Sequence, residues 1–196
     1  MAVKTMSVNT SGDGKFSDGW HELTISAAKY GVYKAATGDK KYISLQFEGY
    51  PDNMDLRIYE VNNKKTGEEF KISNLFKYAN AGIMGVLKDP TGKNPVIQYD
   101  DEASGLIGKK INVLFYKEKK TGKGYTRMFD SISPVEHKGE HLSYTADQVK
   151  GIQSGIEKNL KRMLDASDNT AQNASFGTTT DVAPQAVQTS EPDLPF

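Results

Sequence analysis

The 196-residue chain contains no cysteine, so neither disulfide bonds nor thiolate-ligated zinc sites can form. It also lacks any apolar run close to the roughly 20 residues that a membrane span needs. Its first residues do not begin an apolar segment of signal-peptide length. These absences predict a soluble protein without an export signal, suited to the reducing cytoplasm.

A net charge is absent as well, because 25 Lys and Arg balance 25 Asp and Glu. The balance is uneven along the chain. Residues 165–196 contain five acids and no Lys or Arg, so residues 1–164 hold 20 acids, 25 bases and a net charge of +5. A basic body joined to an acidic end indicates an anionic partner for the body, although such a charge is also ordinary for a soluble domain.

Motifs for catalysis or metal binding are scarce. Residues 12–16, Gly-Asp-Gly-Lys-Phe, lack the Ser or Thr that follows the Lys of a phosphate-binding loop. Residues 9–20 begin like a calcium-binding loop but end on Trp20, where a Glu is required. His137 and His141 are four residues apart, yet the Glu between them is misplaced for a zinc peptidase. We therefore expect no enzymatic activity, no metal and no cofactor.

Alternating apolar and polar residues predict strands over much of the chain from Trp20 onward. The first predicted strands cover residues 20–34, 41–50, 54–62 and 69–72, the last returning from a hairpin tip at Lys64-Lys65-Thr66-Gly67. Gly31 is a predicted bulge. The side chains predicted to face the core from these strands are Ile43, Leu45, Phe47, Leu56 and Ile58.

A helix is predicted next, with Ser73 as its N-cap. Its apolar residues fall at helical spacing, and two glycines are predicted to end it. The apolar residues are Leu75, Phe76, Ala79 and Ile83, and the two glycines are Gly82 and Gly85. Residues 86–108 are predicted to form a loop.

Two more strands are predicted, at residues 109–117 and 125–132, around a second basic tip that spans residues 119–124. Ile111, Val113 and Phe115 are predicted to face the core. In the second strand the core face is ambiguous, because one alternating set competes with another. The two sets are Met128 with Ile132 and Tyr125 with Phe129.

The last predicted helix begins at a capping box made by Thr145 and Gln148. Its apolar stripe consists of Val149, Ile152, Ile156, Leu160 and Met163, which either packs on the body or pairs with another copy. From residue 166 the pattern disappears, which predicts disorder. The predicted parts are a flexible arm (1–19), a β domain (20–144), an amphipathic helix (145–165) and a disordered acidic tail (166–196).

Three strands, a helix and two strands follow the element order of an OB-fold, a small five-stranded barrel. Small sandwiches and other barrels share this order. We therefore predict a mainly β protein with an OB-like five-stranded barrel, an internal helix, a C-terminal helix and a disordered acidic tail.

Basic and aromatic residues are interleaved on the outward positions of the predicted strands. Proteins that bind single strands need cations to neutralise phosphates and flat rings on which bases stack. The candidate DNA-binding residues are Tyr42, Arg57, Tyr59, Lys64, Lys65, Lys110, Tyr116, Lys119, Lys120, Lys123, Tyr125 and Arg127. The alternative interpretation is that the tyrosines fill half-buried strand faces and the lysines prevent edge aggregation.

The sequence ends on Glu191, Pro192, Asp193, Leu194, Pro195 and Phe196, a pattern typical of a docking peptide. The Phe196 ring can fill an apolar pocket, and its carboxylate can pair with a base on a partner. Glu191 and Asp193 can meet a basic rim, while Pro192 and Pro195 stiffen the peptide. The predicted partner-docking residues are Glu191, Asp193, Leu194, Pro195 and Phe196.

The Asp193-Leu194-Pro195-Phe196 end resembles the acidic tip of bacterial single-stranded DNA-binding proteins, which end in Asp-rich sequence followed by Ile-Pro-Phe. Leu194 replaces the Ile, and the acids are fewer. In architecture the chain is similar to single-stranded DNA-binding proteins of tailed bacteriophages. This resemblance implies sequence-independent binding of single-stranded DNA in replication, recombination and repair, in the host cytoplasm if the protein is viral. The tail would recruit polymerase, helicase or nuclease partners, and a homo-oligomer is left open.

Three other functions remain open. One is a phage structural or scaffold module that binds protein, and another is a strand-annealing or RNA-binding protein, since stacking surfaces accept both sugars. A nucleotidyl transferase containing an OB-fold is disfavoured, because no Lys-x-Asp-Gly motif is present.

Overall fold

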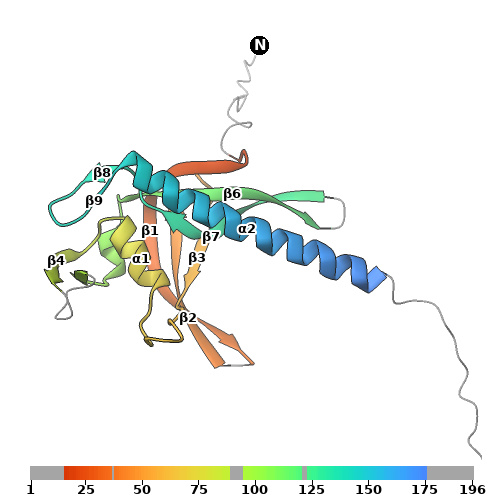
Figure 1. Cartoon of the computed structure of the whole chain (residues 1–196), viewed down its shortest axis with the longest axis horizontal. Coiled ribbons are helices and arrows are strands. Elements are labelled where there is room, and N and C mark those ends of the chain that lie inside the picture. Colours follow the sequence, from red (N-terminus) through yellow and green to blue (C-terminus); the bar gives the residue numbers. More distant parts are fainter. Residues whose placement is uncertain (1–15, 37, 89–94, 121–122, 176–196) are drawn as a thin grey trace, which may run out of the picture. The chain divides into compact units, whose positions relative to one another are not determined.

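A computed structural model describes residues 16–36, 38–88, 95–120 and 123–175 (Figure 1). The helical segments are α1 (Lys71–Tyr78), the 3-10 turn η1 (Ala103–Leu106) and α2 (Ala146–Ser175). The strands are β1 (Gly19–Ala35), β2 (Gly38–Phe47), β3 (Leu56–Tyr59), β4 (Ile83–Lys88), β5 (Pro95–Tyr99), β6 (Lys110–Lys120), β7 (Lys123–Ser133), β8 (His137–Lys138) and β9 (Ser143–Tyr144). The chain divides into two compact units, residues 1–160 and residues 161–196.

Five strands form one antiparallel sheet in the order β3-β2-β1-β6-β7. β1 is the central strand: its residues 19–24 pair with β6, and its residues 25–35 pair with β2. The edge strands β3 and β7 come close to each other, but the described residues show no hydrogen-bonded ladder between them. The predicted mainly β fold with a C-terminal helix is therefore confirmed, and closure of the sheet into a barrel stays a prediction.

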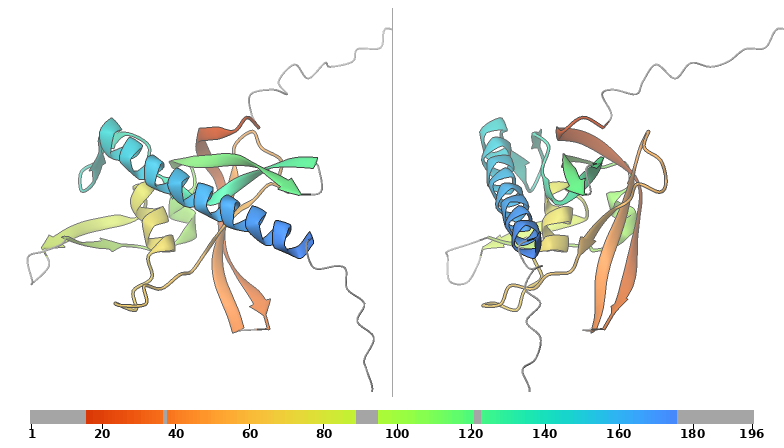
Figure 2. Two further views of the ribbon diagram at one scale, coloured as in Figure 1. Left: turned by 45° about the vertical axis from the view of Figure 1, so that its right-hand side comes forward. Right: turned by 90° about the vertical axis from the view of Figure 1, so that its right-hand side faces the viewer.

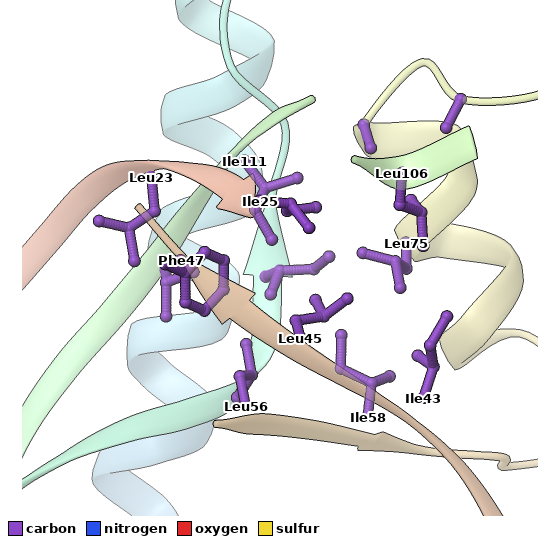
Figure 3. Packing of buried hydrophobic residues seen from close by; sticks show 14 of the residues in the cluster. Leu23, Ile25, Ile43, Leu45, Phe47, Leu56, Ile58, Leu75, Leu106 and Ile111 are labelled. Carbon is purple, nitrogen blue, oxygen red and sulfur yellow. The ribbon is translucent and has the colours of Figure 1, made fainter. Parts of the chain in front are cut away.

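The core lies on one face of this sheet, where α1 and η1 cover it (Figure 3). The faces predicted from alternation are confirmed. Ile43, Leu45 and Phe47 on β2 are at most 3% exposed, as are Leu56 and Ile58 on β3. On β6 the buried side chains of this face are Ile111, Val113 and Phe115.

The pairing of β7 with β6 settles which face of β7 meets the core. Ile132 pairs with Val113 and Met128 pairs with Phe115, and both partners face the core, so Met128 and Ile132 lie on the core side. The register shifts between these two pairs, so β7 holds two extra residues there. Phe129 lies on the other face, where its ring meets Tyr116 edge-on at 6.1 Å.

Helix α2 covers part of this outer face. Trp20 pairs with Leu114 on β6, and the Trp20 indole N–H donates to the Glu157 carboxylate of α2 at 2.7 Å. Leu114 and Phe129 on this face are also buried, although they point away from the main core. The predicted capping box is confirmed, because Thr145 N–H donates to the Gln148 side chain at 2.9 Å.

Gly31 is not the bulge that we predict from sequence. It pairs regularly with Tyr42, and the register shift of β1 lies between Ile25 and Ala27. The glycine instead leaves room for an aromatic ring, because a Cβ at position 31 would lie 2.5 Å from the Tyr42 ring and displace it. Tyr42 therefore lies across the backbone of β1.

The start and end of α1 also differ from the prediction. The helix begins at Lys71, and the Glu69 carboxylate accepts the N–H groups of Ile72 and Ser73 at 2.7 and 2.8 Å. Ser73 is therefore inside the first turn and is not the N-cap. The strand predicted at residues 69–72 is reduced to one bridge between Asn62 and Glu69, because this capping draws the chain into a helix.

The helix ends earlier than its apolar spacing indicates. Asn80 adopts a positive φ of 48°, which lets the Ala81 N–H bond to the Phe76 carbonyl at 2.9 Å and closes the last turn. Ile83 then belongs to β4 instead of α1.

Two further predictions are wrong in extent. The loop predicted at residues 86–108 contains most of the β4–β5 hairpin and η1. Helix α2 continues to Ser175, beyond the predicted end at residue 165.

We expect Leu45→Ala to lower the free energy of unfolding by about 2–5 kcal/mol, because Leu45 is fully buried in the core. Val32→Ala is the matched control on the neighbouring strand. Val32 is 54% exposed, so its truncation should cost about 0.5 kcal/mol or less. Urea denaturation followed by circular dichroism measures both, and equal losses would contradict this position of the core.

Candidate nucleic-acid interface

The outer face of β1, β2 and β3 gathers basic and aromatic residues from all three strands. Residues directly opposite each other on neighbouring strands share one face of a sheet. In the central row, Tyr42 of β2 pairs with Gly31 of β1 and Tyr59 of β3. In the row on one side, Ser44 pairs with Lys29 and Arg57. In the row on the other side, Tyr33 pairs with Lys40. We call this surface the β1–β3 face and define it by Lys29, Tyr33, Lys40, Tyr42, Arg57 and Tyr59.

Two tyrosines form the centre of the β1–β3 face. The rings of Tyr42 and Tyr59 lie 5.5 Å apart with their planes inclined at 51°. Gly31 leaves room for the Tyr42 ring to lie over β1. The Arg57 guanidinium lies 5.4 Å from the centre of the Tyr42 ring, within the range of a cation–π contact. Tyr42 is thereby held between a backbone and a cation.

Asp55 positions the Arg57 side chain. Its carboxylate accepts the Arg57 Nε–H at 2.8 Å and the Ser44 hydroxyl at 2.8 Å. Partial burial on its own would raise the pKa of Asp55, but these two hydrogen bonds and the Arg57 charge outweigh burial and lower the pKa below its ordinary value. The Arg57 side chain is about half-exposed, so solvent screens the pair and it contributes little to stability.

A second group of predicted residues lies on the hairpin of β6 and β7. Tyr116 pairs with Arg127, and Glu118 pairs with Tyr125, so all four lie on one face. Arg127 forms an ion pair with Glu118, and Tyr125 is 53% exposed. Burial, followed by the charge of Glu118, raises the pKa of Tyr116. We call this element the β6–β7 arm.

Three predicted lysines mark the far end of the β6–β7 arm. In the backbone ladder Lys119 pairs with Gly124, and Lys120 pairs with Lys123. The strands therefore extend further into the predicted tip than alternation indicates, and residues 121–122 between them lie outside the described ranges.

The remaining predicted residues lie apart from these two groups. Lys64 and Lys65 are exposed in a turn after β3, where Gly67 N–H donates to the Asn63 carbonyl at 2.7 Å. Lys110 pairs with Thr24 and forms an ion pair with Glu22 at 2.8 Å. It is six residues from Tyr116 along β6, or about 20 Å. The structure thus brings together Tyr42, Arg57 and Tyr59, but does not bring all twelve candidates into one cluster.

Three residues of the β1–β3 face are absent from the sequence-based candidates: Lys29, Tyr33 and Lys40. Tyr33 is 51% exposed. Lys29 pairs with Ser44 beside the buried Ile43 and Leu45, whereas Tyr33 and Lys40 pair where β1 and β2 continue as a hairpin beyond the core. The sequence does contain a pattern that could have identified them. Lys29, Gly31 and Tyr33 alternate along β1 and pair with the outward residues Ser44, Tyr42 and Lys40 of β2.

The opposite face of the same hairpin has a different chemistry. It lines a cavity of about 600 Å³ together with the acidic side chains of Glu60, Glu69 and Asp101. The Tyr30 hydroxyl donates to the Asp101 backbone carbonyl at 3.0 Å. Burial, followed by the charge of Asp101, raises the pKa of Tyr30 to about 12. A phosphate would be repelled from this side, so the two faces of the hairpin favour ligands of opposite charge.

The predicted docking residues Glu191, Asp193, Leu194, Pro195 and Phe196 lie outside the described ranges. Within those ranges no three His, Asp or Glu side chains form a group that could hold a metal ion. The described helices include none with the length and apolar character of a membrane span. No family model matches the chain, and no curated protein matches it.

We expect the Asp55 carboxyl to titrate below its ordinary pKa, and Arg57→Gln to raise that midpoint, because the main favourable partner of the carboxylate is removed. Since the folded pKa is lowered, the stabilisation by Asp55 is present above the unfolded pKa and is lost as the pH falls through the folded value. Carbon-detected NMR titration of the Asp carboxyls measures both. Ser44→Ala should produce a smaller rise, and a wild-type midpoint above the ordinary value would contradict the arrangement.

Proposed function

We propose that this protein binds single-stranded DNA without base preference, with the β1–β3 face as its principal contact surface and the β6–β7 arm as a second. The observation that carries the proposal is the β1–β3 face itself, which combines three tyrosines and three cations in register on one exposed sheet surface. Bases stack on tyrosine rings regardless of their identity, and the cations neutralise phosphates.

A single strand suits this surface better than a duplex. The bases of a duplex stack on one another and hide their faces, whereas an unpaired strand can place its bases on protein rings. Tyr42 and Tyr59 offer two neighbouring rings at 5.5 Å, and Tyr33 offers a third on the adjacent row. Phosphates beside these rings would meet Lys29, Lys40 and Arg57.

We further propose that the sheet is an OB-like barrel. Its support is the strand order β3-β2-β1-β6-β7, the position of α1 between β3 and β6 in the chain, and the approach of β3 to β7. OB-folds bind oligonucleotides on the face of strands 2 and 3 and on the loops that join strands 1–2 and 4–5. The corresponding elements here are the β1–β3 face, the β1–β2 hairpin and the β6–β7 arm.

The ion pairs on both surfaces are compatible with this proposal. Arg57 is paired with Asp55, and Arg127 with Glu118. Both arginine side chains are about half-exposed, and exposed pairs contribute little to stability. When a phosphate arrives, each arginine can exchange one anion for another, so the free energy of binding comes from the released counterions and the stacked bases.

The first test uses the two sides of the β1–β2 hairpin as mutual controls. We expect Lys40→Gln to lower the salt dependence of binding to a fluorescent 30-mer of oligo-dT by about 0.7 in log–log slope, because one phosphate contact is lost. Tyr33→Ala should weaken binding about 5- to 150-fold, the loss of one stacked base. Lys41→Gln and Tyr30→Ala, on the acidic side, should leave affinity nearly unchanged.

Fluorescence anisotropy at two salt concentrations measures these effects, with duplex DNA of equal length as the competitor. Equal losses from Lys40→Gln and Lys41→Gln would show that general charge, and not the β1–β3 face, determines binding. No binding of oligo-dT at low salt would overturn the proposed function itself.

We propose that residues 191–196 recruit replication or recombination proteins and do not contact DNA. Deletion of these residues should leave the affinity for oligo-dT undiminished, and should raise it at low salt because Glu191 and Asp193 repel phosphates. The same anisotropy titration measures this effect. Weaker binding by the shortened chain would place these residues in the DNA interface and contradict a separate docking role.

A further inference from the structure

The hairpin of β4 and β5 forms a two-stranded sheet separate from the five-stranded one (Figure 2). Its base is fixed to the body. The Tyr99 ring stacks on Phe76 with 5.3 Å between centres, and the Tyr99 hydroxyl lies 2.8 Å from the Ser73 hydroxyl. The Asp100 N–H also donates to the Gly82 carbonyl at 2.8 Å. The hairpin is therefore presented in a defined direction.

Beyond this base the hairpin exposes apolar side chains on both of its faces. Leu87 and Val96 are direct partners on one face and are 50% and 48% exposed. Val86 pairs with Ile97 on the other face, and Met84 is 66% exposed at the register shift. A strand with one wet face normally alternates apolar and polar residues, whereas apolar residues on both faces are typical of strands that are covered on both sides.

The edges of this hairpin are open as well. In the described ranges β4 pairs only with β5, so the outer backbone groups of each strand have no strand partner. An isolated two-stranded hairpin is marginally stable in water, and natural edge strands are usually protected by charges or prolines. The only charged residue in β4 and β5 is Lys88, and the only proline is Pro95, at the start of β5.

We propose that a second copy of this chain covers the hairpin, with the two β4 strands pairing antiparallel across a twofold axis to form a four-stranded sheet. β4 is the pairing edge because it carries Met84, Val86 and Leu87, and because Pro95 removes an N–H from β5. This inference does not depend on the proposed DNA binding.

The chemistry of the hairpin favours a copy of the same chain over a different protein. A quarter of the chain is charged, whereas Lys88 is the only charged residue within β4 and β5, so these two strands offer little charge with which a distinct partner could be steered or selected. The one charge on β4, Lys88, lies at the end of the strand, so antiparallel pairing of two β4 strands would place the two lysines at opposite ends, and a twofold interface requires only that the surface complement itself. Pairing of the strands would also bury the apolar side chains of both copies against each other.

The small area of the hairpin sets the strength of this association. Stable interfaces bury about 800 Å² on each partner, and four partly exposed side chains with one backbone edge supply less. We therefore expect a concentration-dependent dimer, formed at about 10 μM and above, in place of an obligate one.

Sedimentation velocity of the full chain without DNA, from about 1 to 200 μM, tests this inference. The wild type should shift from monomer to dimer across this range, and Leu87→Glu should weaken association at least tenfold. Val32→Glu is the matched control, because it places the same charge on an equally exposed apolar residue of the β1–β2 hairpin. Association that survives Leu87→Glu, or a monomer at every concentration, would overturn the proposal.

The lack of cysteine in the chain allows a second, independent test. A disulfide requires Cα atoms about 4.4–6.8 Å apart, which a twofold pairing of β4 provides near its centre. Val86→Cys should therefore form a covalent dimer under mild oxidation, whereas Val32→Cys should remain largely monomeric. Equal cross-linking of the two variants would show random collision, and efficient cross-linking through Met163→Cys on α2 alone would assign the interface to that helix instead.

Discussion

The division of β1 between two partners is the constraint on which the rest of the structure depends. Residues 19–24 pair with β6 and residues 25–35 pair with β2, with the register shift at Ile25 and Ala27 near the boundary. One strand thus joins both halves of the sheet and allows its edges to approach each other. Because β1 is longer than the core requires, its last residues leave the body with β2 as an exposed hairpin.

That hairpin separates two chemistries by the thickness of one sheet. Lys40 and Lys41 are neighbours in the chain, yet one belongs to the β1–β3 face and the other lines the acidic cavity. The period of two in a strand produces this separation without any additional element. In the proposed function, an anionic strand would be attracted to one side and repelled from the other, so the hairpin would orient the strand as well as hold it.

The parts of the fold that sequence predicts are those where a strand has one apolar and one polar face. Ile43, Leu45 and Phe47 show such alternation, and it also places Tyr42 and Tyr59 on the opposite face. On β1 the inward positions beside Lys29 and Tyr33 are Ala28, Tyr30 and Val32, which give a weaker apolar signal than those of β2. Lys29, Tyr33 and Lys40 are therefore absent from the predicted set. β4 and β5 are apolar on both faces and are interrupted by Gly85, so no period indicates a strand. The extra residues in β7 arise from pairing with β6, which local sequence does not encode.

The close approach of Gly31 to Tyr42 couples these two positions in sequence variation. A side chain at position 31 would occupy space that the end of the Tyr42 ring fills, so an exchange there displaces the ring unless position 42 has become small. Tyr42 can be exchanged for a small residue first, because the glycine at position 31 then has no ring to accommodate and causes no clash. The two positions are therefore expected to drift together among related sequences, and a glycine retained in the middle of a long strand marks where an aromatic ring lies across it.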